Sequence, residues 1–338
     1  MPVSVPSGHY DVLSIGNAIV DVMRRCDDGF LAQLGASKGH MTLMASAAEV
    51  TTIERRLKPG VEVAGGGATN LAVGVGYLGG RAAYIGRVAE DEYGRIFRHD
   101  LRTAGIDFTA APTTAAGKET ARSLILITPD GKRTMFTHLG CASEIDTHLI
   151  DAATIGKSKI VFAEGFLMDK MGAKAALMQA TKMATAANRV VALSLSDAQC
   201  VRRHRAAFLG LVKGGLSVLF ANENEIKALY DTDNLDSAMQ ALGHDAKIAV
   251  ITRSERGSLI LSGGKTLAVP AQKVAKVVDV TGAGEFYAAG FLYGLARGMD
   301  LGACGRLGAF AAAEVVGVMG ARPESKLGQL AKMRGLLK

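Results

Sequence analysis

Residues 277–290 read Val-Val-Asp-Val-Thr-Gly-Ala-Gly-Glu-Phe-Tyr-Ala-Ala-Gly. The pattern predicts an apolar strand, Val274 to Val278, that stops at Asp279, passes through a glycine turn and enters a helix. Such strand-to-helix turns are ordinary in α/β proteins. Because helix N-termini present unpaired N–H groups and the positive end of a dipole, the turn Gly282-Ala283-Gly284 is a candidate anion hole for a phosphate group.

Glu285 follows directly, at the rim of this predicted anion hole. A carboxylate there can accept the proton of an alcohol while N–H groups hold the charge on a transferred phosphoryl group. Acidic residues in first helical turns also complement the helix dipole, so the residue types alone support both interpretations equally. A capping box would place the acid three residues after the cap, whereas Glu285 lies four after Thr281, which favours function.

The segment Asp279-Val-Thr-Gly-Ala-Gly-Glu285 resembles the C-terminal signature of the ribokinase/PfkB family of small-molecule kinases, Asp-Thr-x-Gly-Ala-Gly-Asp. Further blocks resemble family motifs in the expected order: Gly65-Gly-Gly-Ala-Thr-Asn70, Gly86-Arg-Val-Ala-Glu-Asp91-Glu-Tyr-Gly94 and Asn222-Glu-Asn-Glu225. With Asn17 and Asp21 near the start, the resemblance spans nearly the whole chain. Residues 16–21 and 137–140 are more similar to adenosine kinases and their bacterial relatives than to ribokinase.

The resemblance implies an enzyme that transfers a phosphoryl group from ATP, with Mg²⁺, to a primary hydroxyl of a ribose-containing substrate, most plausibly adenosine or another nucleoside. Two positions depart from the family pattern. Glu285 stands where the catalytic base is normally Asp, and Ala89 stands where the N-terminal signature usually has Gly. Two alternatives therefore stay open: a free-sugar kinase of the ribose or fructose type, and a weakly active or inactive nucleoside-binding relative.

The same resemblance assigns residues to the substrate. Expected substrate contacts are Asn17, Asp21, Gly65, Gly66, Asn70 and, near the transferred phosphate, Arg133. A carboxylate accepts hydrogen bonds where a vicinal diol donates them, so Asp21 with Asn17 suits paired ribose hydroxyls. Each residue type has a simpler interpretation: an Asx turn for Asn17 and Asp21, helix–strand packing for the glycines and Asn70, and an exposed strand residue for Arg133.

Nucleotide and metal contacts are also implied. The residues expected at the nucleotide are Asn222, Glu225, Thr252, Gly257, Gly282 and Gly284. Asn222 and Glu225 are expected to position water ligands of Mg²⁺, which usually retains waters, although their spacing equally fits a helix capping box. Asp279 is expected either to organise a monovalent-cation site, such as one for K⁺, or only to close the turn.

Continuous apolar runs alternate with helical patterns along the chain. The runs are Tyr10 to Ile15, Ala82 to Ile85, Lys159 to Ala163, Val190 to Leu195, Ser217 to Ala221 and Ile248 to Thr252. The helical patterns are Ala68 to Leu78, Glu92 to Thr103, Lys174 to Ala187, Arg203 to Leu211 and Glu223 to Tyr230. The alternation predicts one ribokinase-like α/β domain over residues 1–338, a doubly wound, mostly parallel sheet flanked by helices. Asn17, Glu164 and Asn222 each follow a run, where such sheets bind ligands.

Two segments break this pattern, residues 22–44 and 108–137. The second contains Arg122 to Thr128, then Pro-Asp-Gly, then Lys132 to Thr137, which predicts a β-hairpin. We expect both segments to form a small sheet outside the main one. By resemblance this sheet is a lid that closes over the substrate and excludes water.

The composition fits a cytoplasmic enzyme. The net charge of +7 suits an anionic substrate such as a nucleotide, but the basic residues are dispersed, so we expect no nucleic-acid partner. Four widely spaced cysteines predict reduced thiols. The start lacks the pattern of a signal peptide and no apolar run is long enough to span a bilayer, so we expect no membrane association. The chain is expected to be a monomer or a homodimer.

Overall fold

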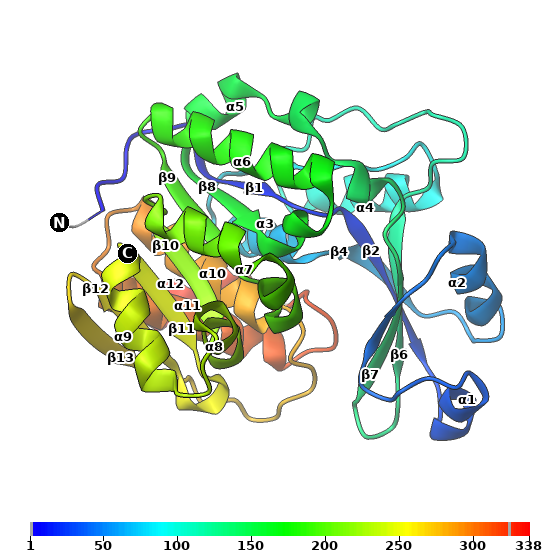
Figure 1. Ribbon diagram of the computed structural model, residues 1–338. Helices are drawn as coiled ribbons and strands as arrows, with labels where there is room; N and C mark the ends of the chain where they lie inside the picture. The colour runs from blue at the N-terminus through cyan, green and yellow to red at the C-terminus, as the bar shows by residue number, and fades with distance from the viewer. Residues whose placement is uncertain (1–2, 324–325) are drawn as a thin grey trace.

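The computed structural model describes residues 3–323 and 326–338, and its centre is an eight-stranded sheet with the order β13-β12-β11-β10-β9-β8-β1-β5 (Figure 1). Neighbours from β5 to β11 run parallel, and the last two strands add an antiparallel edge. The strands are β1 (Tyr10–Ile15), β5 (Ala82–Ile85), β8 (Ser158–Glu164), β9 (Val190–Ser194), β10 (Val218–Asn222), β11 (Ile248–Thr252), β12 (Ser258–Ser262) and β13 (Lys265–Val269).

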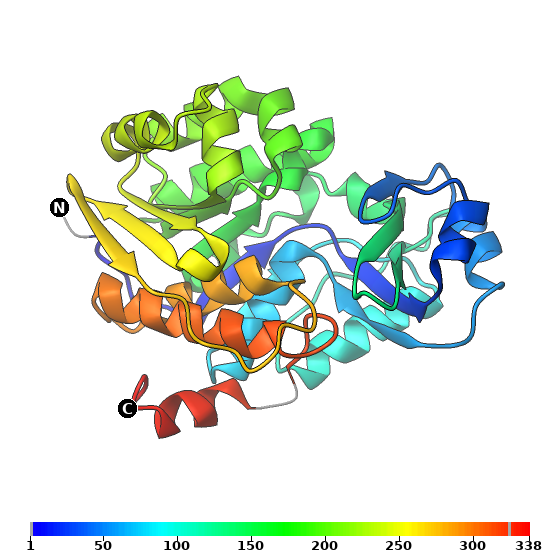
Figure 2. The same cartoon turned by 90° about the horizontal axis from the view of Figure 1, so that it is seen from below.

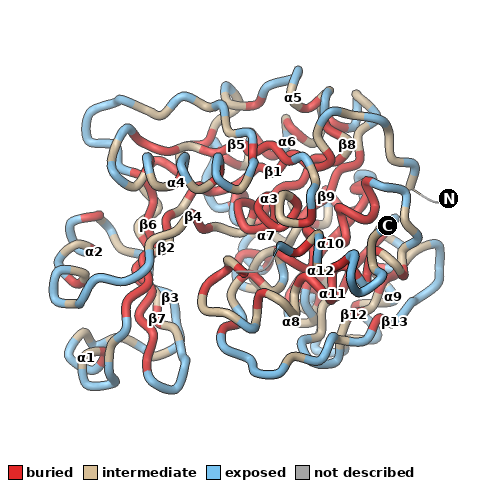
Figure 3. The backbone as a smooth tube through the Cα atoms, turned by 180° about the vertical axis from the view of Figure 1, so that it is seen from behind, coloured by how far each residue is buried: buried red, intermediate tan, exposed pale blue. Residues whose placement is uncertain are grey.

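Helices cover both faces of this sheet, as the alternating sequence pattern predicts (Figures 1 and 2). One layer holds α3 (Gly67–Tyr77), α10 (Ala283–Ala296), α11 (Leu301–Val316) and α12 (Leu327–Met333). The other holds α5 (Ala152–Lys157), α6 (Met171–Ala186), α7 (Ala198–Lys213), α8 (Glu223–Tyr230) and α9 (Leu235–Asp245). Alternate residues of a strand face opposite layers, so the strands from β5 to β11 are buried on both sides, whereas the edge strand β13 is exposed at four of its five residues (Figure 3).

A second sheet of five strands, the lid, projects from one side of this body (Figure 2). Its order is β3-β7-β6-β2-β4, with β2 (Ile19–Arg25), β3 (Met41–Leu43), β4 (Val61–Gly65), β6 (Ala121–Ile127) and β7 (Arg133–His138). Helices α1 (Asp28–Gln33), α2 (Ala47–Glu54) and α4 (Glu92–Thr103) lie on its outer side, where Val20, Leu31 and Val50 join the core. The inner side carries the smaller cluster of Met23, Ile125 and Ile127.

The lid is larger than the two segments from which it was predicted. The hairpin β6–β7 is present, but β2 begins at Ile19 rather than Val22, and β4 also belongs to the sheet. The segment 22–44 contains a short helix, α1, and residues 108–120 contribute no strand to the lid. A two-turn helix and an edge strand of five residues carry too little periodicity to be recognised from residue patterns.

The predicted strand Val274 to Val278 is wrong. The segment is an irregular loop in which Val277 is 55% exposed, and its N–H at Val278 bonds to the carbonyl of Val316 rather than to a strand. Neither sheet takes this segment as a strand, because the N–H groups of Val278 and Asp279 both donate to the carbonyl of Val316 at the end of α11. The helix predicted after the turn is α10.

No helix among residues 3–323 and 326–338 has the length and apolar character needed to cross a bilayer. Three of the residues singled out in the sequence lie at the carboxyl ends of parallel strands, as expected for this architecture, whereas the turn before Glu285 follows a loop. Asn17 follows β1, while Glu164 and Asn222 are the last residues of β8 and β10.

Candidate active site

The glycine turn before α10 has the geometry that its sequence predicts. Gly282 is the N-cap of α10 with a φ of 76°, and a Cβ on it would lie 2.7 Å from the Cβ of Ala321. Both facts require glycine. Ala283 donates its N–H to the carbonyl of Val280, whereas Gly284 is exposed and an added Cβ there would meet nothing within 4 Å. The first turn of α10 therefore faces open space at Gly284.

Asp279 holds this turn in place. One carboxylate oxygen accepts from the N–H and the hydroxyl of Thr281, at 3.0 and 2.7 Å, and the other accepts from the N–H of Gly320 at 2.8 Å. The lid residue Arg133 lies 3.3 Å from the first oxygen. These contacts agree with turn closure, one of the two roles expected of Asp279. The cation site stays a prediction.

A second glycine turn begins α3 beside the first. Gly66 is the N-cap with a φ of 94°, and an added Cβ would overlap the carbonyl oxygen of Asn17. A Cβ on Gly67 would lie 3.1 Å from Oε2 of Glu164 and 3.4 Å from Oε1 of Glu285. The carboxylates of Glu164 and Glu285 therefore both lie beside Gly67. This is the place where the start of α3 meets the end of β8 and the start of α10.

Glu164 is the site residue that sequence reasoning left without a role. Its Oε1 accepts from the backbone and side-chain N–H groups of Asn17, at 2.7 and 2.9 Å, and its Oε2 accepts from the N–H of Ala68 at 2.9 Å. Burial raises the pKa of Glu164 to about 7; its hydrogen bonds oppose this rise and the Glu285 carboxylate adds to it. The feature of the sequence that could have identified Glu164 as a site residue is its position, as a charged residue at the end of an apolar strand.

Burial also raises the pKa of Glu285, while a hydrogen bond with its own backbone N–H lowers it. A carboxylate with a raised pKa is a stronger base than an exposed one, which suits proton abstraction from an alcohol. Glu285 is on the first turn of α10, next to the open space at Gly284.

Asp21 and Asn17 are not on one helical turn. Asp21 is in the middle of β2, where its carboxylate lies against Gly65 and would overlap a Cβ on that residue. Burial raises the pKa of Asp21 to about 6, although Arg133 and Arg322 lower it. The side-chain amide of Asn17 is used by Glu164, so Asn17 is fixed rather than free.

Asn70, in α3, accepts a hydrogen bond of 2.7 Å from Arg322. The same guanidinium donates to the carbonyl of Ala64 in β4 and therefore joins the lid to α3. Arg322 was not identified from the sequence, because nothing in its immediate surroundings marks it as different from other basic residues.

Asn222 and Glu225 form the reciprocal capping box at the start of α8. Asn222 accepts from the N–H of Glu225 at 2.9 Å, and the Glu225 carboxylate accepts from the backbone and side-chain N–H groups of Asn222, at 2.9 and 2.7 Å. Burial raises the pKa of Glu225 to about 7, and the Glu285 carboxylate contributes to the rise. The charge of Glu285 therefore contributes to the raised pKa of both Glu164 and Glu225.

The two other expected nucleotide contacts lie further along the same sheet. Thr252 pairs with Asn222 across β10 and β11, and its hydroxyl is 3.4 Å from the carbonyl of Ala221. Gly257 has a φ of 79° and passes so close to Val269 that a Cβ would overlap its carbonyl. Thr252 is therefore next to the capping box, whereas Gly257 is required by the turn before β12.

Comparison with known proteins supports a kinase. Residues 37–326 match the model of the pfkB family carbohydrate kinases. A probable sugar kinase from Rhizobium etli is 41% identical, with a TM-score of 0.91, over 98% of this chain and 100% of that one. An adenosine kinase from Sinorhizobium meliloti is 44% identical, with a TM-score of 0.90, over 96% and 99%. A 5-dehydro-2-deoxygluconokinase from Shouchella clausii is 23% identical over 91% of this chain and 90% of its own.

The ribokinase-like fold and the phosphotransferase class expected from the sequence are confirmed by these matches. The relatives act on substrates of two kinds, nucleosides and sugars, so the finer assignment has to come from the site. The chain belongs to the PfkB family of carbohydrate kinases.

Proposed function

We propose that this protein transfers a phosphoryl group from ATP to the primary hydroxyl of a nucleoside, with adenosine as the preferred acceptor. The observation that carries the proposal is the inner face of the lid. In-register pairing across four strands puts Asp21, Ser123, Thr137 and Leu43 in one row on that face. Adjacent strands are about 4.8 Å apart, so the row is about 14 Å long, enough for a ribose with a base attached.

The chemistry changes along this row. It begins with the Asp21 carboxylate, passes the hydrogen-bonded hydroxyls of Ser123 and Thr137, and ends at Leu43, which is 60% exposed. Met41, two residues before Leu43 on the same face, is 47% exposed. Exposed apolar side chains at a ligand site suit a flat, weakly polar base, whereas a free sugar offers hydroxyls that they cannot pair with.

Two further features of the structure support a binding site for the nucleobase of the acceptor. A cavity of about 340 Å³ starts at Leu43 and runs along His138 to Cys141, at the end of β7. Phe166, which follows Glu164 by two residues, is 38% exposed. Aromatic side chains bind planar rings by stacking. The adenosine kinase from Sinorhizobium meliloti, with 44% identity, points to the same class of acceptor.

In this proposal Glu285 accepts the proton of the acceptor hydroxyl, and the backbone at Gly282 to Gly284 faces the transferred phosphoryl group. Asp21 accepts hydrogen bonds from the ribose diol. Arg133 supplies a positive charge from the lid to the transferred phosphoryl group. It does so either after leaving Asp279 or while still paired with it. Closure of the lid would exclude water, which otherwise competes as an acceptor.

The residues also fit a divalent cation. Glu164 and Glu225 both lie close enough to Glu285 for its charge to contribute to their raised pKa values, although burial is the larger cause. Oxygen donors of this kind are those that Mg²⁺ prefers, and Asn222 with Glu225 would hold its water ligands. When bound, Mg²⁺ would neutralise charge on the phosphates.

The proposal is tested by a coupled ATP-consumption assay with adenosine, other nucleosides, ribose, fructose and 5-dehydro-2-deoxygluconate as acceptors. We expect adenosine to give the highest kcat/KM. Leu43→Ser should raise KM for adenosine, whereas Met178→Ser, which changes an exposed methionine on α6, should not. A free sugar preferred over every nucleoside would refute the nucleoside assignment, and binding without turnover of any acceptor would point to the inactive alternative.

A further inference from the structure

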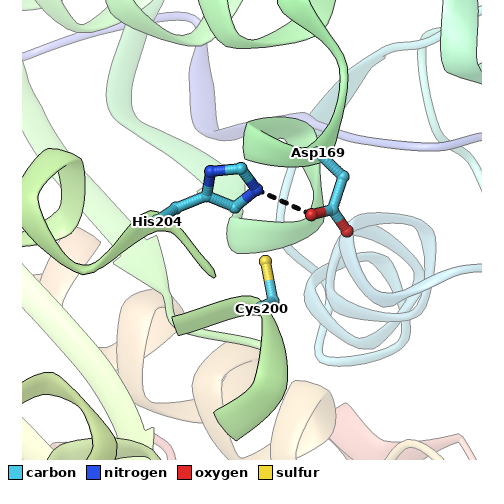
Figure 4. A group of neighbouring side chains, drawn as sticks. All are labelled: Asp169, Cys200 and His204. Carbon is cyan, nitrogen blue, oxygen red and sulfur yellow. Dashed lines mark hydrogen bonds and ion pairs between the residues drawn. The ribbon is translucent and has the colours of Figure 1, made fainter. Parts of the chain in front are cut away.

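Asp169, Cys200 and His204 form a cluster separate from the residues assigned above (Figure 4). Asp169 ends the short 3-10 helix Gly165–Asp169, which follows directly after Glu164, and the other two lie on α7. Their candidate ligand atoms, a carboxylate oxygen, Sγ and a ring nitrogen, all lie within 4.8 Å of one another. Nε2 of His204 is 2.8 Å from Oδ1 of Asp169.

The backbone explains why these side chains meet. Cys200 and His204 are four residues apart, so a helix puts them on the same face. At His204 the helix departs from regular geometry, with φ −122° and ψ 22°. Figure 4 shows the imidazole directed at the Asp169 carboxylate, with the Cys200 sulfur below both. Cys200 is fully buried, whereas His204 and Asp169 retain partial exposure of 23% and 29% for their side chains.

We propose that Asp169, Cys200 and His204 bind one divalent transition-metal ion of the Zn²⁺ class, with water as the fourth ligand. Thiolate, imidazole and carboxylate are the three donor types that Zn²⁺ takes from proteins, and three protein ligands plus one water is a common set. Partial exposure of Asp169 and His204 provides the route by which the ion and its water enter.

The distances require only a small adjustment. Around a tetrahedral ion with bonds of about 2.0 to 2.3 Å, ligand atoms are about 3.3 to 3.6 Å apart. The Asp169–His204 pair, now 2.8 Å apart, would therefore open by about half an ångström, and Cys200 Sγ, within 4.8 Å of both atoms, would approach by at most about one. Arg203 now donates to Oδ1 of Asp169 from Nε and Nη2, at 3.1 and 2.9 Å, and to Oδ2 from Nη2. It would keep the 2.8 Å bond to Oδ2 while the ion takes Oδ1, as carboxylate ligands are commonly supported.

Binding would change the protonation of the cluster. Burial raises the pKa of Cys200 to about 12, so in the absence of an ion the group is a neutral thiol, with Sγ 3.5 Å from the carbonyl of Gly165. Formation of the sulfur–metal bond converts the S–H to a thiolate and releases one proton to solvent. The ion would join α7 to the segment that follows Glu164 and would stabilise the folded chain as any ligand of the native state does.

Cobalt(II) titration of the full-length protein, freed of metal by chelation, tests the site. We expect one equivalent to bind with a near-ultraviolet sulfur-to-cobalt band and the visible bands of tetrahedral Co²⁺. Cys200→Ser should remove the sulfur band, and His204→Gln should weaken binding at least about 10-fold. Cys304→Ser, which changes another buried thiol, should leave both signals intact.

Thermal unfolding gives a second readout that does not depend on spectra. At the same concentration Zn²⁺ should raise the Tm of the wild-type protein and of Cys304→Ser more than that of His204→Gln, and addition of Zn²⁺ to a weakly buffered sample should release one proton per chain. The proposal fails if Co²⁺ binds without a sulfur band, or if His204→Gln binds Co²⁺ as tightly as the wild type. It also fails if Zn²⁺ leaves the wild-type Tm unchanged.

Discussion

In the proposed function Asp21 is the charged contact of the lid with the substrate, because it lies in β2 on the face where Ser123 and Thr137 follow. A hydrogen bond to a charged group contributes about 1.5 to 3 kcal/mol. Asp21→Ala should therefore lower kcat/KM for adenosine about 10- to 100-fold. A 2′-deoxy nucleoside should lose most of its disadvantage in this variant. Steady-state kinetics with Asp233→Ala as an exposed control would check this, and unchanged kinetics in Asp21→Ala would remove the residue from the site.

Glu164 makes stability depend on pH. Its pKa in the folded chain, about 7, lies above the value of about 4.5 in the unfolded chain. At pH values between these two, the folded chain binds more protons than the unfolded chain. Stability contributed by the protonated group is present at low pH and is lost as pH rises from about 4.5 to about 7. Urea unfolding at pH 5 and pH 8 should show a smaller fall for Glu164→Gln than for the wild type. An equal fall in both proteins would show that Glu164 titrates normally.

At the scale of elements, the turn before α3 is fixed by glycine geometry. Gly66→Ala should destabilise the protein by more than about 1 kcal/mol, because a left-handed φ is unfavourable for alanine and its Cβ would overlap Asn17. Gly210→Ala is the matched control: it lies inside α7 with open space around it and should stabilise by roughly 0.5 to 1 kcal/mol. Equal Tm values for the two variants in thermal unfolding would contradict this account.

Elements with strong local signals could be predicted from the sequence, and those set by distant partners could not. The strands Tyr10–Ile15, Ala82–Ile85 and Ile248–Thr252 have the predicted bounds, because predominantly apolar runs of this length are typical of buried strands. Val274 to Val278 has the same composition but no neighbour to pair with. A β-branched run becomes a strand only where the fold supplies a partner.

The same distinction holds for the site. Motif spacing indicated Glu285, Gly66 and Asn222 because the chemistry of each is local to a helix start. The roles of Glu164 and Arg322 depend on contacts across 96 and 252 residues of sequence, with Ala68 and Asn70 respectively. No pattern in a single sequence encodes such long-range pairs.

For the whole molecule, the arrangement of the lid predicts a motion. Polar links between the lid and the body include the Arg133–Asp279 pair and the Arg322 contacts. Hydrogen exchange should therefore show increased protection of β2, β3, β6 and β7 when adenosine binds, with little change in the central strand β9. Protection confined to the turn Gly282 to Glu285 would argue against closure of the lid.

In the proposed function Glu285 is the base that accepts the proton of the acceptor hydroxyl. The most direct measurement is the rate of adenosine-dependent ATP consumption by the wild type and by Glu285→Gln, with nucleotide binding measured in both. Glutamine keeps the size of the side chain but cannot accept the proton, so kcat should fall about 10²- to 10⁴-fold while nucleotide affinity changes little. An active wild type together with a fully active Glu285→Gln would contradict the account and leave Glu285 as a residue that only stabilises the start of α10.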